Sequence, residues 1–206
     1  MSQIALPLAW PAGDAERDFC VGPANAAAAR HLAHWSLWPV MATLLTGPRK
    51  SGRTLLGRIF AAKAGGTLID DAETRAEADI FHAWNRAQAE RRPLLLIADA
   101  PPPAWRIALP DLRSRLIASP HIAIAEPDDA LAAAILEKQL GARGLEAGPE
   151  LLRWLVRRIE RSYLGIYRAV EALDEAALSR RARLTVPLAR RALSAVGVID
   201  DSHMAG

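Results

Sequence analysis

The stretch that decides the fold of this 206-residue chain is Gly47-Pro48-Arg49-Lys50-Ser51-Gly52-Arg53-Thr54. An apolar segment, residues 40–46, precedes it, and a segment with helical character, residues 54–64, follows it. Glycines let the backbone N–H groups of such a turn point inward, and the N-terminus of the next helix favours an anion. The pattern predicts a phosphate-binding loop. The structural alternative is a glycine turn that only connects a strand to a helix.

The motif departs from the usual one at Arg53, where lysine is typical. Arginine keeps the positive charge but is planar and bulkier, so we expect it to suit a diphosphate better than a γ-phosphate. Thr54 would be a Mg²⁺ ligand. The motif predicts these nucleotide-binding residues: Gly47, Lys50, Ser51, Gly52, Arg53, Thr54 and Leu55.

Outward from the turn, expected strands alternate with expected helices, which favours a parallel sheet with right-handed crossovers. The strands are expected at residues 40–46, 66–70, 94–98 and 121–125, and the helices at 25–35, 54–64 and 75–90. After Pro127 the pattern is helical throughout, at 128–140, 149–159, 163–181 and 187–195, with Asp128 as a helix cap. We therefore expect an extended arm at residues 1–18, an α/β domain at 19–126 and an all-helical domain at 127–206.

Acidic residues follow two of the expected strands. The pair Asp70 and Asp71 ends the second strand and could be a Walker B pair, Asp70 joining Thr54 in holding Mg²⁺. A capped turn before a helix is the alternative, because aspartate is favoured in both places. Asp99 ends the third strand and could sense a γ-phosphate, although a simple loop would use similar residues. Only one helix fits between Thr54 and the second strand, so the usual further strand–helix unit is expected to be missing or merged with another element.

The segment 109–116 places Arg113 and Arg115 in an expected loop before the fourth strand. In P-loop ATPases that assemble, an arginine there can reach a neighbour's nucleotide and stabilise the charge of the transferring phosphoryl group. The alternatives are a solvated surface arginine, or an arginine that pairs with a carboxylate such as Asp111 to shape the loop.

The expected arm contains Gln3-Ile4-Ala5-Leu6-Pro7-Leu8, a short apolar peptide with a leading glutamine. Such a segment can dock in extended form in a hydrophobic pocket of a partner. It could equally pack on its own domain.

Composition narrows the class of protein. The net charge is +3 and the basic residues are dispersed, which is weak evidence for direct binding of nucleic acid. One cysteine excludes an intrachain disulfide, and the most apolar stretch, residues 26–45, carries Arg30, His31, His34 and Pro39, which argues against a membrane span. The N-terminal residues lack the pattern of a secretory signal, so we expect a cytoplasmic protein.

Taken in order, these motifs resemble the Hda family, relatives of the replication initiator DnaA that keep its AAA+ module and lack its DNA-binding domain. The resemblance implies an α/β P-loop AAA+ domain, a parallel sheet with flanking helices, followed by a small all-helical lid domain. It rests on residues 3–7, 19–25, 47–54, 99–102, 109–116 and 183–187.

The resemblance implies a regulatory adaptor that limits replication initiation. Its arm would bind the DNA polymerase III sliding clamp, it would hold ADP (or ATP) with Mg²⁺, and Arg115 would promote hydrolysis of DnaA-bound ATP. The protein would contact DNA only through the clamp. ATP hydrolysis by the chain itself would be slow or absent. Both a monomer and a homodimer are compatible with the resemblance. Leu164 stands where the family carries a sensor arginine, flanked by Arg161 and Arg168. A free-standing P-loop ATPase and a clamp-loader or helicase-loader component are the competing interpretations. The clamp-binding residues would be Gln3, Ile4, Leu6 and Pro7.

Overall fold

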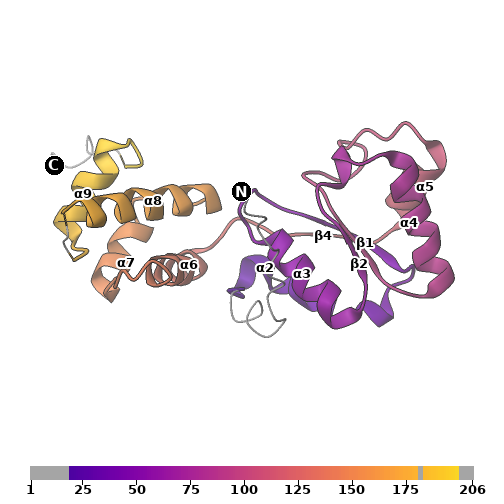
Figure 1. Cartoon of the computed structure of the whole chain (residues 1–206), viewed down its shortest axis with the longest axis horizontal. Helices are drawn as coiled ribbons and strands as arrows, with labels where there is room; N and C mark the ends of the chain where they lie inside the picture. Colours follow the sequence, from indigo (N-terminus) through magenta and orange to yellow (C-terminus); the bar gives the residue numbers. More distant parts are fainter. Residues whose placement is uncertain (1–18, 181–182, 200–206) are drawn as a thin grey trace, which may run out of the picture. The chain divides into compact units, whose positions relative to one another are not determined.

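The computed structural model describes residues 19–180 and 183–199, and its contacts divide the chain into two compact units. The first unit contains Phe19 and residues 32–44 and 52–121. The second contains residues 20–31, 45–51 and the described residues from 122 onward. Figure 1 shows the sheet with its helices and the separate group of C-terminal helices.

Four strands form one parallel sheet in the order β2-β3-β1-β4. Leu68 of β2 lies opposite Leu95 of β3 in parallel register. The Leu44 N–H donates to the Pro120 carbonyl at 2.9 Å, beside the start of β4. The parallel sheet expected from the sequence is confirmed. The strands are β1 (Ala42–Thr46), β2 (Thr67–Ile69), β3 (Leu94–Ile97) and β4 (His121–Ala123).

Helices of the first unit cover both faces of its part of the sheet, as Figure 1 shows for α3 on one side and α4 and α5 on the other. Leu94 and Leu96 pack with α4 and α5. On the other face, a Cβ at Gly57 of α3 would lie 2.8 Å from Ile97 Cδ1, so this glycine allows close approach of helix and strand. Every residue of β1 and β3 is buried, as is usual for a sheet covered on two faces. The helical elements here are 3-10 helix η1 (Trp35–Leu37), α3 (Arg53–Ala64), 3-10 helix η2 (Ala72–Thr74), α4 (Glu77–Glu90) and α5 (Pro110–Ala118).

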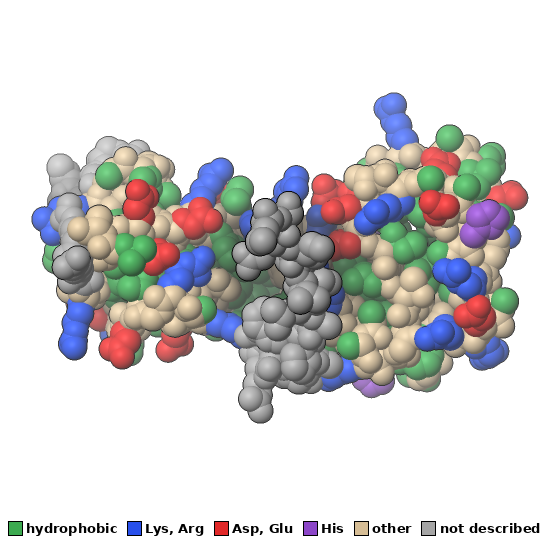
Figure 2. Space-filling model, viewed as in Figure 1, with side chains coloured by type: hydrophobic (Ala, Val, Ile, Leu, Met, Phe, Trp, Pro, Cys, Tyr) green, Lys and Arg blue, Asp and Glu red, His purple; other side chains and the backbone are tan. Residues whose placement is uncertain are grey.

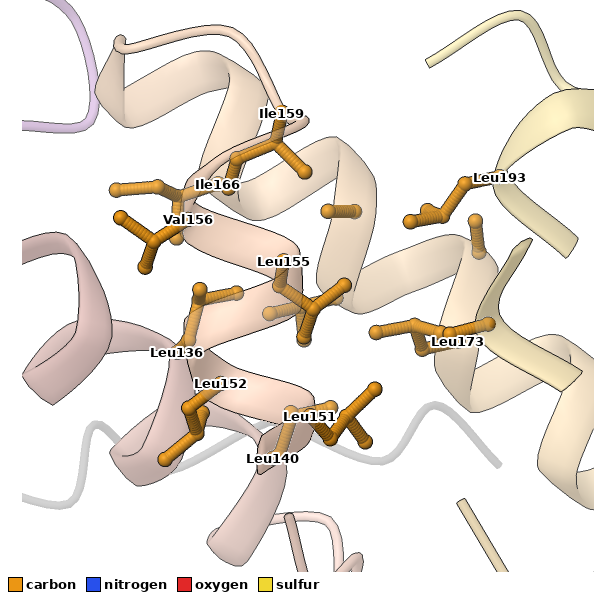
Figure 3. Packing of buried hydrophobic residues seen from close by; sticks show 14 of the residues in the cluster. Leu136, Leu140, Leu151, Leu152, Leu155, Val156, Ile159, Ile166, Leu173 and Leu193 are labelled. Carbon is orange, nitrogen blue, oxygen red and sulfur yellow. The ribbon is translucent and has the colours of Figure 1, made fainter. Parts of the chain in front are cut away.

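The C-terminal helices enclose a separate aliphatic core, drawn in Figure 3. Leu155 of α7 and Ile166 of α8 are fully buried there, and they pack in one cluster with Leu136 of α6, Leu173 of α8 and Leu193 of α9. Asp128 caps α6, its carboxylate accepting the Leu131 N–H at 2.7 Å, so the expected cap is confirmed. The helices are α6 (Asp129–Gly141), α7 (Pro149–Val156), α8 (Tyr163–Arg180) and α9 (Val186–Ala195), and α2 (Pro23–Ala33) precedes the sheet.

One expected loop is a helix. The segment before the fourth strand, expected to be a loop that carries Arg115, forms α5, which begins at Pro110. Proline is favoured in the first turn of a helix because its missing N–H has no partner to lose there. The loop prediction is therefore wrong, and the first-turn proline was the signal for the helix. No helix within residues 19–180 and 183–199 is long and apolar enough to cross a membrane.

Candidate functional site

The glycine turn after β1 has a backbone that few residues other than glycine adopt. Gly47 and Gly52 have φ of 155° and 85°, and Lys50 has φ of 68°. A Cβ at Gly47 would stand 2.9 Å from the Ile124 Cβ, so a side chain has no room there. Positive φ values in such a turn direct neighbouring amides into a concave anion site. The turn therefore has a backbone suited to phosphate.

The Ser51 hydroxyl is a second feature of this turn that fits a bound anion. Its side chain is buried, and its Oγ has no hydrogen-bond partner among the described residues. A buried hydroxyl without a partner costs about 1–3 kcal/mol. A phosphate oxygen at the turn would supply the missing partner, so this part of the motif fits a nucleotide.

The side chain of Arg53 is held by other residues of the same chain. Its guanidinium, in a residue only 9% exposed, donates to the Ala98 carbonyl at 2.9 Å and forms an ion pair with the Asp99 carboxylate. The Asp99 N–H in turn donates to the Glu73 carboxylate at 2.9 Å. Two predicted binding residues, Arg53 and Asp99, are thus brought together, but as partners of each other. The cation of the motif is neutralised from within, which does not fit a γ-phosphate held by Arg53.

The remaining residues of the motif take other positions. The Lys50 ammonium lies 5.5 Å from the centre of the Tyr167 ring, an exposed cation over an aromatic face. Thr54 and Leu55 are half-buried in the first turn of α3. Gly52 caps that helix, and the Phe19 ring lies 3.1 Å from where its Cβ would stand.

Asp70 and Asp71 form a local turn at the end of β2. The Asp71 N–H donates to the Asp70 carboxylate at 3.1 Å, and Asp71 adopts φ of 50°. The Thr74 hydroxyl donates to the Asp71 carbonyl at 2.7 Å. In the part of the chain that the structure describes, no group of three or more His, Cys, Asp or Glu side chains could hold a metal. Asp71 precedes the 3-10 helix η2 without a side-chain cap hydrogen bond, so the contacts show a turn but no side-chain cap, and the Mg²⁺ role of Thr54 and Asp70 stays a prediction.

Arg115 lies on α5 and is held by residues of α4. Its guanidinium carbon is 4.7 Å from the centre of the Phe81 ring and 4.6 Å from that of Trp84. Its Nη1 donates to the Asn85 side-chain oxygen. Arg113, two residues earlier, is exposed. Sequence reasoning missed these α4 partners, although their spacing places them on one helix face.

Leu164, where the resemblance implies that the family carries a sensor arginine, is 42% exposed. Beside it, Arg161 pairs with Asp129 at 3.1 Å on the surface. Tyr163 is buried, and its hydroxyl donates to the Ala125 carbonyl at 3.1 Å. Burial, with smaller contributions from Glu126 and Asp128, raises the pKa of Tyr163 to about 12.

The predicted clamp-binding residues Gln3, Ile4, Leu6 and Pro7 lie outside the described residues. On the face drawn in Figure 2, acidic and basic side chains are interspersed rather than gathered into one large patch of either sign.

Residues 129–193 match the family described as "Hda, lid domain". An uncharacterized protein of Haemophilus influenzae is 32% identical over 119 residues, which cover 57% of this chain and 52% of that protein. The chain thus spans about half the length of this curated relative.

Solved structures are similar in fold. Domain III of the replication initiation protein DnaA from Thermotoga maritima superposes with a TM-score of 0.73 at 16% identity, over 89% of this chain and 96% of that one. AMPPCP-bound DnaA from Aquifex aeolicus gives 0.60 at 17% identity, over 76% and 63%. The Thermotoga maritima RuvB Holliday junction branch migration motor gives 0.57 at 11% identity, over 89% and 68%.

Proposed function

We propose that this chain, an AAA+ protein with a DnaA-like fold and an Hda-type lid domain, is a regulatory adaptor that promotes hydrolysis of DnaA-bound ATP. The observation that carries the proposal is the lid: the match to the Hda lid domain spans residues 129–193, from α6 into α9. In this proposal the arm, residues 1–18, tethers the adaptor to the sliding clamp, and DNA is met through the clamp.

The nucleotide site supports an adaptor more than an independent ATPase. The fold that carries this site is similar to that of DnaA from Aquifex aeolicus, whose structure has been solved with bound AMPPCP. The turn amides and the Ser51 hydroxyl would hold the phosphates of ADP, which would keep the AAA+ module in shape. Arg53 is occupied by Asp99 and the Ala98 carbonyl, so it is poorly placed to act on a γ-phosphate. We therefore expect binding of ADP at least as tight as that of ATP, with little turnover.

Arg115 is the residue proposed to act in trans on DnaA-bound ATP. An arginine that meets charge developing in a phosphoryl-transfer transition state can be worth about 10³- to 10⁵-fold in rate. Because the effect lies in the chemical step, its loss should not be repaired by adding more adaptor.

The test measures ATP hydrolysis by DnaA on clamp-loaded DNA with increasing adaptor. Arg115→Ala should bind the clamp and fail to stimulate even at saturation. Arg113→Ala, a matched change of an exposed arginine on the same helix, should reach the wild-type rate. Recovery of the Arg115→Ala rate at high concentration would mean that Arg115 supplies only binding. No stimulation by the wild-type chain would refute the adaptor function itself.

The clamp tether has its own test. Replacing Gln3, Leu6 and Pro7 together with alanine should abolish clamp binding in a pull-down and leave the melting temperature nearly unchanged. Survival of clamp binding would remove the arm from the proposal and leave the action on DnaA to be judged separately.

A further inference from the structure

We infer that α4 positions Arg115 through Phe81, Trp84 and Asn85, and that this positioning leaves the guanidinium charge available for the phosphates of a partner's nucleotide. The inference rests on the proposed function and adds three positioning residues to it. Asn85 has to be uncharged in this arrangement, because a negative side chain there would neutralise Arg115.

Three side chains of α4 contact the Arg115 guanidinium. Phe81, Trp84 and Asn85 follow the i, i+3, i+4 spacing of one helix face. Both ring centres lie within 5 Å of the guanidinium carbon, and the amide oxygen of Asn85 accepts from Nη1. A planar guanidinium that contacts two rings and donates to one acceptor has less freedom to rotate than a solvated one. The ordering that an acting arginine needs is therefore present before any partner binds.

The backbone of Arg115 is also linked to α4 by hydrogen bonds. The Ser119 hydroxyl donates to the Arg115 carbonyl at 2.9 Å, and the Trp84 indole N–H donates to the same hydroxyl at 3.2 Å. Ser119 is buried. One serine thus links the backbone of Arg115 to the ring that packs on its guanidinium, so α4 and α5 hold the arginine as a unit.

The electrostatics distinguish Arg115 from a structural arginine. Among residues 19–180 and 183–199, its contacts are two aromatic faces and an amide oxygen, none of which carries a negative charge. Arg53, by contrast, is neutralised by the Asp99 carboxylate. The Arg115 side chain is half-buried, and most of its five N–H donors remain for another acceptor. A fixed cation without a counter-ion is suited to an anion with several acceptor oxygens, such as a polyphosphate.

Asn85→Asp separates positioning from simple stabilisation. The two side chains have nearly the same shape, but the aspartate would form an ion pair with Arg115 and neutralise it. If the contact served stability alone, the variant would be at least as stable and as active as the wild type. If the charge is needed, stability stays the same or rises while stimulation of DnaA falls.

The experiment measures the DnaA ATPase rate at saturating adaptor, together with the thermal melting temperature of each adaptor. We expect Asn85→Asp to melt no lower than the wild type and to stimulate at least tenfold less. Asn85→Ala, which loses the acceptor and keeps the charge free, should lose less activity. The matched control is Ala62→Asp, the same charge change at an exposed position of α3, on the other face of the sheet. It should stimulate normally.

The outcomes are distinguishable. Full stimulation by Asn85→Asp, with Arg115→Ala inactive, would refute the positioning inference and leave the proposed function standing. Full stimulation by Arg115→Ala would refute the proposed role of Arg115, and the inference with it. A fall in melting temperature that accompanies lost stimulation in Asn85→Asp would assign the contact to folding and also refute the inference.

Discussion

Removing the ion pair between Arg53 and Asp99 tests how the start of α3 is held beside the end of β3. The Arg53 side chain is 10% exposed and that of Asp99 is 58% exposed. Exposed pairs contribute about 0.2–1 kcal/mol, whereas removing one partner of a fully buried pair costs about 3–5 kcal/mol. A pair with one buried cation and one solvated carboxylate lies between these limits. We expect a coupling free energy of about 1–2 kcal/mol.

The two single variants should lose different amounts of unfolding free energy. Asp99→Ala removes the counter-ion but leaves the Ala98 carbonyl as an acceptor, so it should cost about 1–2 kcal/mol. Arg53→Ala also removes a charged hydrogen bond, worth about 1.5–3 kcal/mol, and should cost more. For a chain of this size each kcal/mol corresponds to about 2–4 °C in melting temperature.

The assay is a double-mutant cycle by denaturant unfolding of the wild type, Arg53→Ala, Asp99→Ala and the double variant. Changes at independent sites add within about 0.3–0.5 kcal/mol. A coupling free energy below that limit would refute the ion pair as a stabilising contact, and with it the reason for expecting weak contact between Arg53 and a γ-phosphate. The matched control is a cycle on Arg161 and Asp129, an exposed pair at 3.1 Å whose coupling should be under about 1 kcal/mol.

Three further predictions concern the same chain. Calorimetry should show ADP binding at least as tightly as ATP, and steady ATP hydrolysis by the isolated protein would favour the ATPase interpretation. Because the native pKa of Tyr163 is about 12 and the ordinary value is 10.0, the unfolded state loses this proton first. Stability should therefore fall as pH rises from 10 to 12, and Tyr163→Phe should make that fall shallower in alkaline melts; an unchanged slope would contradict it. Asp128→Ala should cost about 1 kcal/mol in denaturant unfolding through loss of the α6 cap, and Asp129→Ala clearly less; equal costs would argue against the cap.

Much of the fold follows from local patterns. Continuous apolar runs between turn residues indicated β1 and β3, because a sheet covered on both faces needs no polar side of a strand. Asp128 was identifiable as a cap because its side chain acts within three residues of itself. The glycine turn at residues 47–52 was identifiable for the same reason, since Gly47 and Gly52 serve the local backbone, and phosphate binding there stays a prediction.

The candidate site was less predictable because its contacts join distant segments. Nothing near Arg53 indicates that Asp99 will neutralise it, because that contact depends on the end of β3 lying beside the start of α3. Asp70 and Asp71 were ambiguous for a different reason. The same aspartate side chain can serve as a metal ligand or as a turn residue, so the sequence alone does not separate the two roles.

Arg53 and Arg115 show why a motif arginine has to be judged by its counter-charge. Both stand at positions where the family resemblance predicts contact with phosphate, and both are at least half-buried. The two rings and the amide oxygen that contact Arg115 carry no formal charge, whereas the Asp99 carboxylate offsets the charge of Arg53, so the charge of Arg115 is less compensated than that of Arg53. The chain thus carries one arginine whose charge is used within the fold and one whose charge is held in place but not neutralised. In the proposed function, phosphoryl-transfer chemistry therefore belongs to Arg115, acting on a partner's nucleotide, and the chain's own turn would bind ADP with little turnover.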